Sequence, residues 1–301
     1  MSVIVGVHGI AQQQLGRGQL AAVWSPSLTD GVEAALSGRR VAELPFDLAY
    51  YGRLFLDATG RTGSGTGAGA RARAGTKAGA AAEDPADLAE LSHEEQEELL
   101  AAAHDAAGAQ AFEASATQAT KGYSRVPQPF QVAFRALDWR FGPGAALLFV
   151  GAFRQVRSYL RDPELKAGID AVVDASVTAD TRVLVGHSLG SVVAFEFVRR
   201  HPRSKLDLLL TVGSPLGTRF VRALMPHPDH GASGLPPGLK EWVNVRDARD
   251  PVAFAGDLSE HWPRVRDVTV DNGGDAHAVS RYLSKKQTGA AVLEALPDLA
   301  R

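Results

Sequence analysis

The sequence predicts an α/β fold with a mostly parallel central sheet of about six strands and helices on both faces. Three observations lead to this prediction. The run at 3–7 is short, apolar and β-branched, as in a strand that is buried on both faces of a parallel sheet. Strand-like and helix-like segments alternate clearly through the C-terminal half, which favours parallel strands joined by helices. With 301 residues, of which 45% are hydrophobic, the chain has enough apolar side chains for one sizeable core. We therefore expect one domain over residues 1–301.

Two further elements are expected before residue 50. Apolar residues in 19–36 fall on roughly one helical face, and Pro26 predicts a break in that helix. The segment 41–48 predicts a second strand, which Pro45 shortens.

A long helical insert is expected over residues 58–160. Residues 60–82 are rich in Gly and Ala and have almost nothing to bury, so they predict a flexible loop. The region 83–160 predicts a helical cap or lid. In it Ser92 begins a capping-box pattern, and Gly142-Pro143-Gly144 divides an apolar stretch into two helical pieces. The apolar block 147–150 with Phe153 either covers an acyl-binding pocket or packs the insert against the sheet.

The C-terminal half predicts four strands and several helices. The expected strands are 182–185, 206–212, 242–245 and 265–270, and the expected helices are 189–200, 218–224 and pieces between 276 and 296. In such folds the functional site lies at the carboxyl ends of the strands.

Composition excludes several classes of protein. The chain has 34 acidic and 32 basic residues, a net charge of −2, which does not favour nucleic-acid binding. There is no Cys, which excludes disulfides, thiolate metal sites and Cys nucleophiles. We expect no signal peptide, no stable membrane insertion and a cytoplasmic location, because no basic and apolar leader and no long apolar run is present. No protein partner is indicated.

The motif Gly186-His187-Ser188-Leu189-Gly190 stands between a predicted buried strand and a predicted helix. A serine presented on a sharp strand-to-helix turn needs strained backbone angles, and Gly on either side leaves room for the tight bend. This placement predicts a nucleophilic serine at position 188.

A serine nucleophile needs a base, and the base needs an orienting carboxylate, which follow the serine in such a site. His277 follows the last predicted strand, and Asp250 follows the strand at 242–245. Asp247 is the alternative acid and His261 the alternative base. Asp271 and Asp275 are lesser candidates that suit turns.

Together with Val7-His8-Gly9-Ile10, Gly213-Ser214-Pro215-Leu216 and Asp250-Pro251-Val252, these residues resemble the lipase and esterase branch of the α/β-hydrolase fold. The resemblance covers residues 1–50 and 180–300. It implies that Ser188 is the nucleophile, His277 the general base and then acid, and Asp250 the residue that orients His277. It also implies an oxyanion hole formed by the N–H groups of Ile10 and Leu189, with no cofactor.

Further residues are expected to line the substrate site: His8, Gly9, His187, Pro215 and Leu216. His8 is expected to support the oxyanion loop by hydrogen bonds. His227-Pro228-Asp229-His230 has the residue types of a metal site, but a solvated loop is favoured and no metal is expected.

The expected activity is hydrolysis of a carboxylic ester, small or lipid-like, through an acyl-enzyme on Ser188. A thioesterase or acyltransferase would use the same groups. The alternative from another class is a non-catalytic or effector-type interaction protein on a hydrolase scaffold.

Overall fold

A six-stranded sheet, in which all strand pairs are parallel, forms the centre of the protein and confirms the predicted α/β class. The computed structural model describes residues 3–9, 12, 14–56, 88, 91–116, 123, 126–226, 235–236 and 238–300. The strands are β1 (Ile4–Val7), β2 (Phe46–Ala49), β3 (Val183–His187), β4 (Leu208–Val212), β5 (Glu241–Asp247) and β6 (Arg266–Val270). Their order in the sheet is β2-β1-β3-β4-β5-β6.

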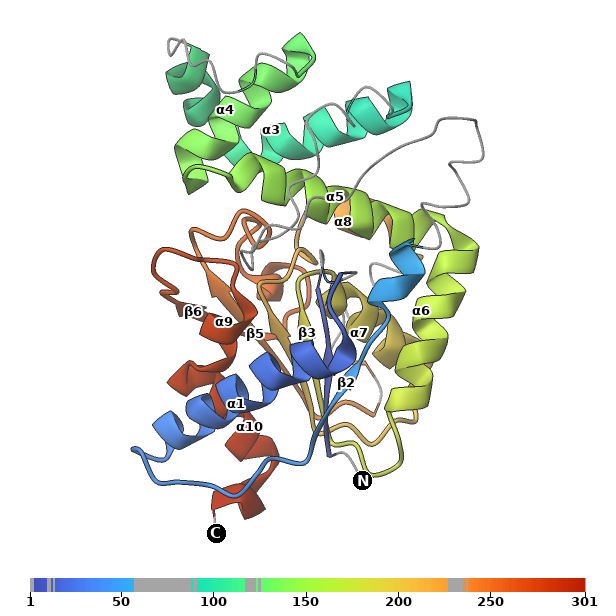
Figure 1. Ribbon diagram of the computed structural model, residues 1–301, viewed down its shortest axis with the longest axis vertical. Helices are drawn as coiled ribbons and strands as arrows, with labels where there is room; N and C mark the ends of the chain where they lie inside the picture. Colours follow the sequence, from blue (N-terminus) through green and yellow to red (C-terminus); the bar gives the residue numbers. More distant parts are fainter. Residues whose placement is uncertain are drawn as a thin grey trace.

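Helices cover both faces of the sheet (Figure 1). One face carries α1 (Arg17–Ala35), α9 (Val279–Leu283) and α10 (Lys286–Ala295), and the other carries α6 (Pro163–Ser176) and α7 (Leu189–Arg200). Neighbouring residues of β3 belong to different cores, since Val183 and Val185 pack toward α1 while Leu184 packs toward α7. This two-sided burial explains why the strand sequences are almost continuously apolar.

The break expected at Pro26 is wrong, because α1 runs without interruption from Arg17 to Ala35 with Pro26 inside it. The buried residues Leu20, Trp24, Leu28 and Val32 follow one another every four positions. Their burial against the sheet holds both halves of the helix in line, and this packing outweighs the backbone hydrogen bond that proline cannot donate.

A second group of helices lies above the carboxyl ends of the strands (Figure 1). It consists of α3 (His93–Ala116), α4 (Gln128–Phe141) and α5 (Ala145–Arg161), with α8 (Arg219–Leu224) beneath α5. Helices α3, α4 and α5 share a core of their own. The predicted flexible loop at 60–82 lies outside the described residues, so the expected insert is described only in part.

Local signals in the sequence correspond to the helix ends of this group. Ser92 and Glu95 form the capping box, with the N–H of Glu95 donating to Ser92 Oγ over 3.2 Å. The chain is broken between α4 and α5 at Gly142 and Gly144, which both have positive φ. Helix α6 was not predicted, although Asp162 followed by Pro163 is a helix-start signal. Asp162 Oδ1 accepts from the N–H groups of Glu164 and Leu165.

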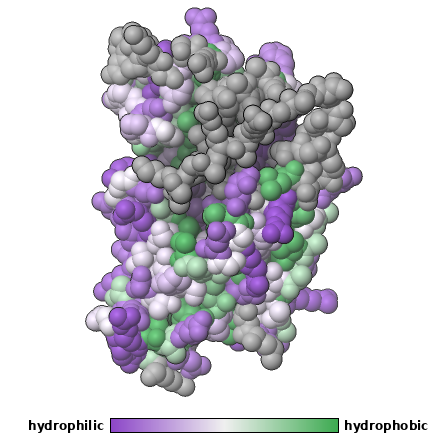
Figure 2. All heavy atoms as spheres, viewed as in Figure 1, coloured by the Kyte–Doolittle hydropathy of each residue, from purple (hydrophilic) through white to green (hydrophobic). Residues whose placement is uncertain are grey.

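Among the residues that the structure describes, no helix is long and apolar enough to cross a membrane. On the face shown in Figure 2, the coloured hydrophobic residues are scattered among hydrophilic ones over the sheet-containing part of the molecule.

Candidate functional site

Ser188 lies on a strained turn between β3 and α7. Its backbone angles are φ 54° and ψ −128°, and Ser37 is the other non-glycine residue with positive φ among those described. A Cβ on Gly190 would lie 2.0 Å from the carbonyl oxygen of Val7, and a Cβ on Gly186 would lie 2.6 Å from that of Gly190. Both glycines are therefore required by the close approach of backbone segments, as the motif predicted.

The Ser188 side chain is fully buried, and its Oγ has no hydrogen-bond partner among the described residues. The serine N–H donates to the carbonyl of Val212 on the neighbouring strand over 3.1 Å, which ties the turn to the sheet. Leu189 is the first residue of α7, and the first N–H groups of a helix have no acceptor within that helix. Ser188 is thus the N-cap residue at the positive end of α7, directly before Leu189.

His277 and Asp250 form a buried pair. His277 Nδ1 lies 2.9 Å from Asp250 Oδ1 and 2.8 Å from Oδ2, and the N–H of Val252 also donates to Oδ1 over 2.8 Å. His277 Nε2 is buried and has no hydrogen-bond partner in the described part of the chain. The carboxylate therefore keeps the proton on Nδ1, which leaves Nε2 free to accept one.

His187 connects the serine turn to this pair. Its Nε2 lies 2.9 Å from the carbonyl oxygen of His277, so this nitrogen carries the proton and donates it, and the two imidazole rings are 4.6 Å apart. Burial, followed by the nearby His277, lowers the pKa of His187 to about 3. His187 is therefore a neutral donor that positions the backbone of His277.

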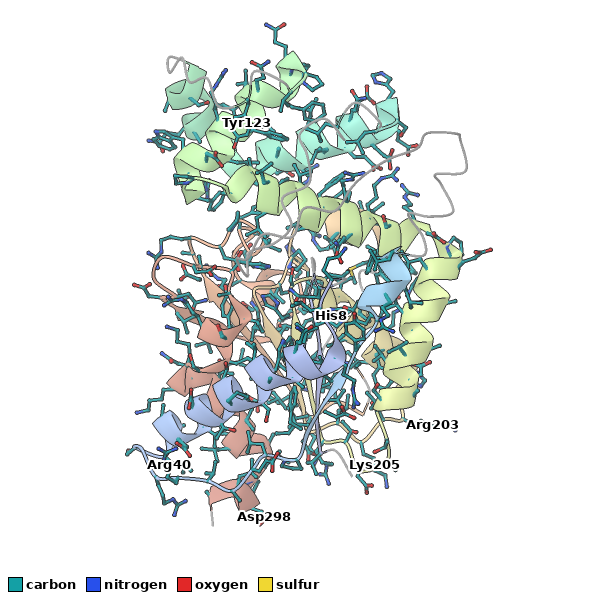
Figure 3. All side chains as sticks on the ribbon, in the orientation of Figure 1. His8, Arg40, Tyr123, Arg203, Lys205 and Asp298 are labelled. Carbon is teal, nitrogen blue, oxygen red and sulfur yellow. The ribbon has the colours of Figure 1, made fainter. Side chains whose placement is uncertain are left out.

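The loop after β1 reaches the same place. A Cβ on Gly9 would lie 2.7 Å from Ser188 Cβ, so this glycine lies against the serine. His8 Nδ1 lies 2.9 Å from the carbonyl oxygen of Gly9, and His8 Nε2 accepts from the N–H of Tyr51 over 3.1 Å. Burial lowers the pKa of His8 to about 4, which agrees with its expected structural role. Figure 3 shows His8 at the carboxyl end of the sheet, far from Arg203 and Lys205 at the opposite end.

Two tyrosines in the site have no local sequence signal and were missed. The Tyr51 hydroxyl donates to the carbonyl of His8, and the two rings stack with their centroids 4.0 Å apart. The Tyr282 hydroxyl donates to Asp250 Oδ2 over 2.8 Å. Both are contacts between residues far apart in the chain, so only the fold reveals them.

The alternative acid and base occupy other positions. Asp247 accepts from the backbone N–H groups of Arg249 and Asn272, so it connects the turns after β5 and β6. His261 lies beside Trp262, next to Gly217. Asp271 pairs with Arg249 at the surface. Of these candidates, Asp250 is the carboxylate that contacts His277.

A small apolar pocket lies between α3, α5, α8 and the loops after β4 and β5. Four phenylalanines line it: Phe149 and Phe153 from α5, Phe220 from α8, and Phe254. Pro215 and Val252 also line it, and Val252 is bonded to Asp250. Leu216, by contrast, is fully buried in the core beside α7.

Ile10, whose N–H is expected to help form the oxyanion hole together with that of Leu189, lies outside the described residues. The segment His227-Pro228-Asp229-His230, for which no metal is expected, also lies outside them. Elsewhere, within the described ranges, no group of three or more His, Asp or Glu side chains is placed to hold a metal ion.

No family model matches the chain, and no curated protein or solved structure proved similar to it.

Proposed function

We propose that the protein is a serine hydrolase of the α/β-hydrolase type that cleaves carboxylic esters through an acyl-enzyme on Ser188. The observation that carries this proposal is the arrangement around the strained serine turn. A buried serine at the start of α7 directly follows His187, whose ring lies 4.6 Å from that of His277, and Asp250 lies 2.8 Å from Nδ1 of His277. Nucleophile, base and orienting acid are the groups that acyl transfer requires.

In the proposed reaction, Ser188 Oγ attacks the ester carbonyl while its proton passes to His277 Nε2. The carbonyl oxygen of the ester, which becomes negative, accepts a hydrogen bond from the N–H of Leu189. The family resemblance implies that the N–H of Ile10 is a further donor to this oxygen. Each such donor lowers the barrier by roughly 3–4 kcal/mol. His277 then protonates the leaving alcohol, and a water molecule, deprotonated by His277, releases the acid from Ser188.

Proton transfer needs a hydrogen bond that the resting site lacks, since both Ser188 Oγ and His277 Nε2 are without partners in the described residues. Catalytic hydrogen bonds are often long in a free enzyme and shorten once substrate is bound. Two unpaired buried polar atoms are also costly to keep, which is typical of a functional site.

The apolar pocket supports an ester with an apolar acyl group as the substrate. Most of the side chains that line it are apolar, and one lining residue, Val252, donates its backbone N–H to Asp250. Both interpretations of the 147–150 block find support, because Phe149 and Phe153 line this pocket while Phe149, Val150 and Phe153 also belong to the core shared by α3, α4 and α5.

A fluorophosphonate probe tests the proposal. The wild-type protein should be labelled covalently, and Ser188→Ala should abolish the labelling. Ser176→Ala is a matched control, because the Ser176 hydroxyl lies on α6 and only donates to the carbonyl of Val172.

Labelling that survives in Ser188→Ala would show that another residue is the nucleophile. A folded wild-type protein that is not labelled at all would favour the non-catalytic interaction protein.

A further inference from the structure

The hydroxyl of Tyr282 bridges the end of β5 and the buried acid of the candidate site. It accepts from the backbone N–H of Asp247 over 2.9 Å and donates to Asp250 Oδ2 over 2.8 Å. Tyr282 belongs to α9, which begins two residues after His277. A single hydroxyl group therefore connects β5, the acid and the helix that follows the base.

The position of the hydroxyl proton follows from the chemistry of the two partners. A backbone N–H only donates, so the tyrosine oxygen must accept from Asp247. A carboxylate only accepts, so the tyrosine proton must point to Asp250. Burial, followed by the charge of Asp250, raises the pKa of Tyr282 far above its ordinary value, so the hydroxyl stays protonated.

The Tyr282–Asp250 contact is tightly packed, with no room for a side chain at Gly213. Gly213 has φ +56°, and a Cβ there would lie 2.9 Å from Asp250 Oδ2, 2.9 Å from Tyr282 Cε2 and 3.3 Å from His277 Nδ1. The end of β4 thus carries a glycine where the acid, the base and the tyrosine meet. With Oδ1 held by the N–H of Val252, the Tyr282 hydroxyl is the side-chain donor that holds the other carboxylate oxygen beside His277.

We propose that Tyr282 is a positioning residue, whose hydroxyl fixes the carboxylate of Asp250 and so sets the orientation and basicity of His277. This inference rests on the proposed function for its kinetic readout. The hydroxyl and the His277 ring both donate to the Asp250 carboxylate, and the hydroxyl stabilises part of its negative charge. Without it, more of that charge acts on the imidazole, which stabilises the protonated ring.

Other ionisable groups around His277 do not produce the same effect. His187, which faces it from β3, stays neutral because burial lowers its pKa to about 3. Asp247 accepts hydrogen bonds from Arg249 and from the backbone N–H of Asn272. Within the described residues, it has no hydrogen bond to the imidazole of His277. The charge that responds to Tyr282 is therefore that of Asp250.

The experiment compares Tyr282→Phe with Tyr159→Phe. Tyr159 is a matched control on α5, since its buried hydroxyl accepts from Lys166 over 3.0 Å and donates to Asp170 over 2.7 Å, away from the serine turn. Tyr282→Phe should lower kcat/KM for p-nitrophenyl acetate about tenfold at neutral pH and move the acid limb of the pH profile upward by about half a unit or more. Tyr159→Phe should leave the acid limb in place.

A second readout does not depend on activity. The ¹⁵N-labelled imidazole of His277 is followed by NMR as the pH is lowered, and its titration midpoint should rise in Tyr282→Phe. A midpoint and acid limb that stay unchanged, in a Tyr282→Phe protein that is folded, would overturn the positioning role. If the wild type is neither active nor labelled by the fluorophosphonate, the proposed function fails, while the NMR comparison still decides the role of Tyr282.

Discussion

Asp250 and Asp247 are three residues apart, yet they lie in different environments. Asp250 accepts from His277, Tyr282 and the N–H of Val252, whereas Asp247 accepts from backbone groups in two turns. Sequence alone leaves both open, because Asp247 ends β5 and Asp250 follows it closely. The choice depends on where the turn after the strand directs each carboxylate.

Replacing each carboxylate by an amide should therefore have a different effect, on turnover for Asp250 and on stability for Asp247. Asp250→Asn should lower kcat by up to ~10⁴-fold, because the amide favours the wrong tautomer of His277. Asp247→Asn should reduce the free energy of unfolding by about 1–3 kcal/mol and change kcat only a few-fold, because it weakens bonds that hold the turns. Esterase kinetics and urea unfolding of both variants measure this. Near-normal turnover in Asp250→Asn would remove it from the proposed triad.

What the sequence can predict of the site depends on how local each signal is. The serine turn carries a five-residue motif, in which Gly186 is required by a contact with Gly190 at the turn and Gly190 by the close approach of Val7 on β1. Tyr282 and Tyr51 act through contacts with segments far away in the chain, and neither has a motif around it. The geometry of the site beyond the serine turn therefore had to come from the fold.

At the scale of elements, α5 contributes one side of the apolar pocket. Phe153 stacks on Phe220 of α8 with ring centroids 4.3 Å apart, and Phe149 contacts Phe254 with centroids 6.1 Å apart. The sequence predicted α5 and α8 closely, because Gly144 and Thr218 mark their starts. It did not predict how they face each other, since helical periodicity says which face is apolar but not what covers it.

Filling this pocket should change acyl specificity more than catalysis. Ala152, on α5, lines the pocket, and Ala152→Trp should reduce kcat/KM for p-nitrophenyl octanoate about tenfold or more relative to the acetate ester. Gly151→Trp is the matched control, because a Cβ there meets nothing within 4 Å. Comparing both esters with both variants is the measurement. An equal loss on both esters in Ala152→Trp would show that the pocket does not hold the acyl chain.

At the scale of the whole molecule, the sheet brings together residues from five strand ends. The chain places β2 and β3 on opposite sides of β1, and the site forms at the carboxyl ends beside this reversal. His8, Ser188, Gly213, Asp250 and His277 follow β1, β3, β4, β5 and β6 in turn. Alternation of strands and helices predicts this convergence in outline, because parallel strands all end at one edge.

The same convergence buries two neutral imidazoles, and it makes the stability of the protein depend on pH. Burial lowers the pKa of His8 to about 4 and that of His187 to about 3, against an ordinary value of 6.5. Unfolding exposes both rings, which then bind protons that the folded state does not bind. Their contribution is therefore complete above an unfolded pKa of about 6.5 and is lost progressively as the pH falls below it.

Lowering the pH from about 7.5 to about 5 should reduce the free energy of unfolding by about 2 kcal/mol for each of these two imidazoles. Carboxylates with lowered pKa, such as Glu196, bonded to Arg199 and Lys166, begin to contribute only at lower pH. Urea unfolding at the two pH values measures the loss. His187→Gln should remove about half of it, because glutamine does not titrate, whereas His93→Gln, at an exposed position, should not alter it. A loss in His187→Gln as large as in the wild type would mean that His187 does not carry this pH dependence.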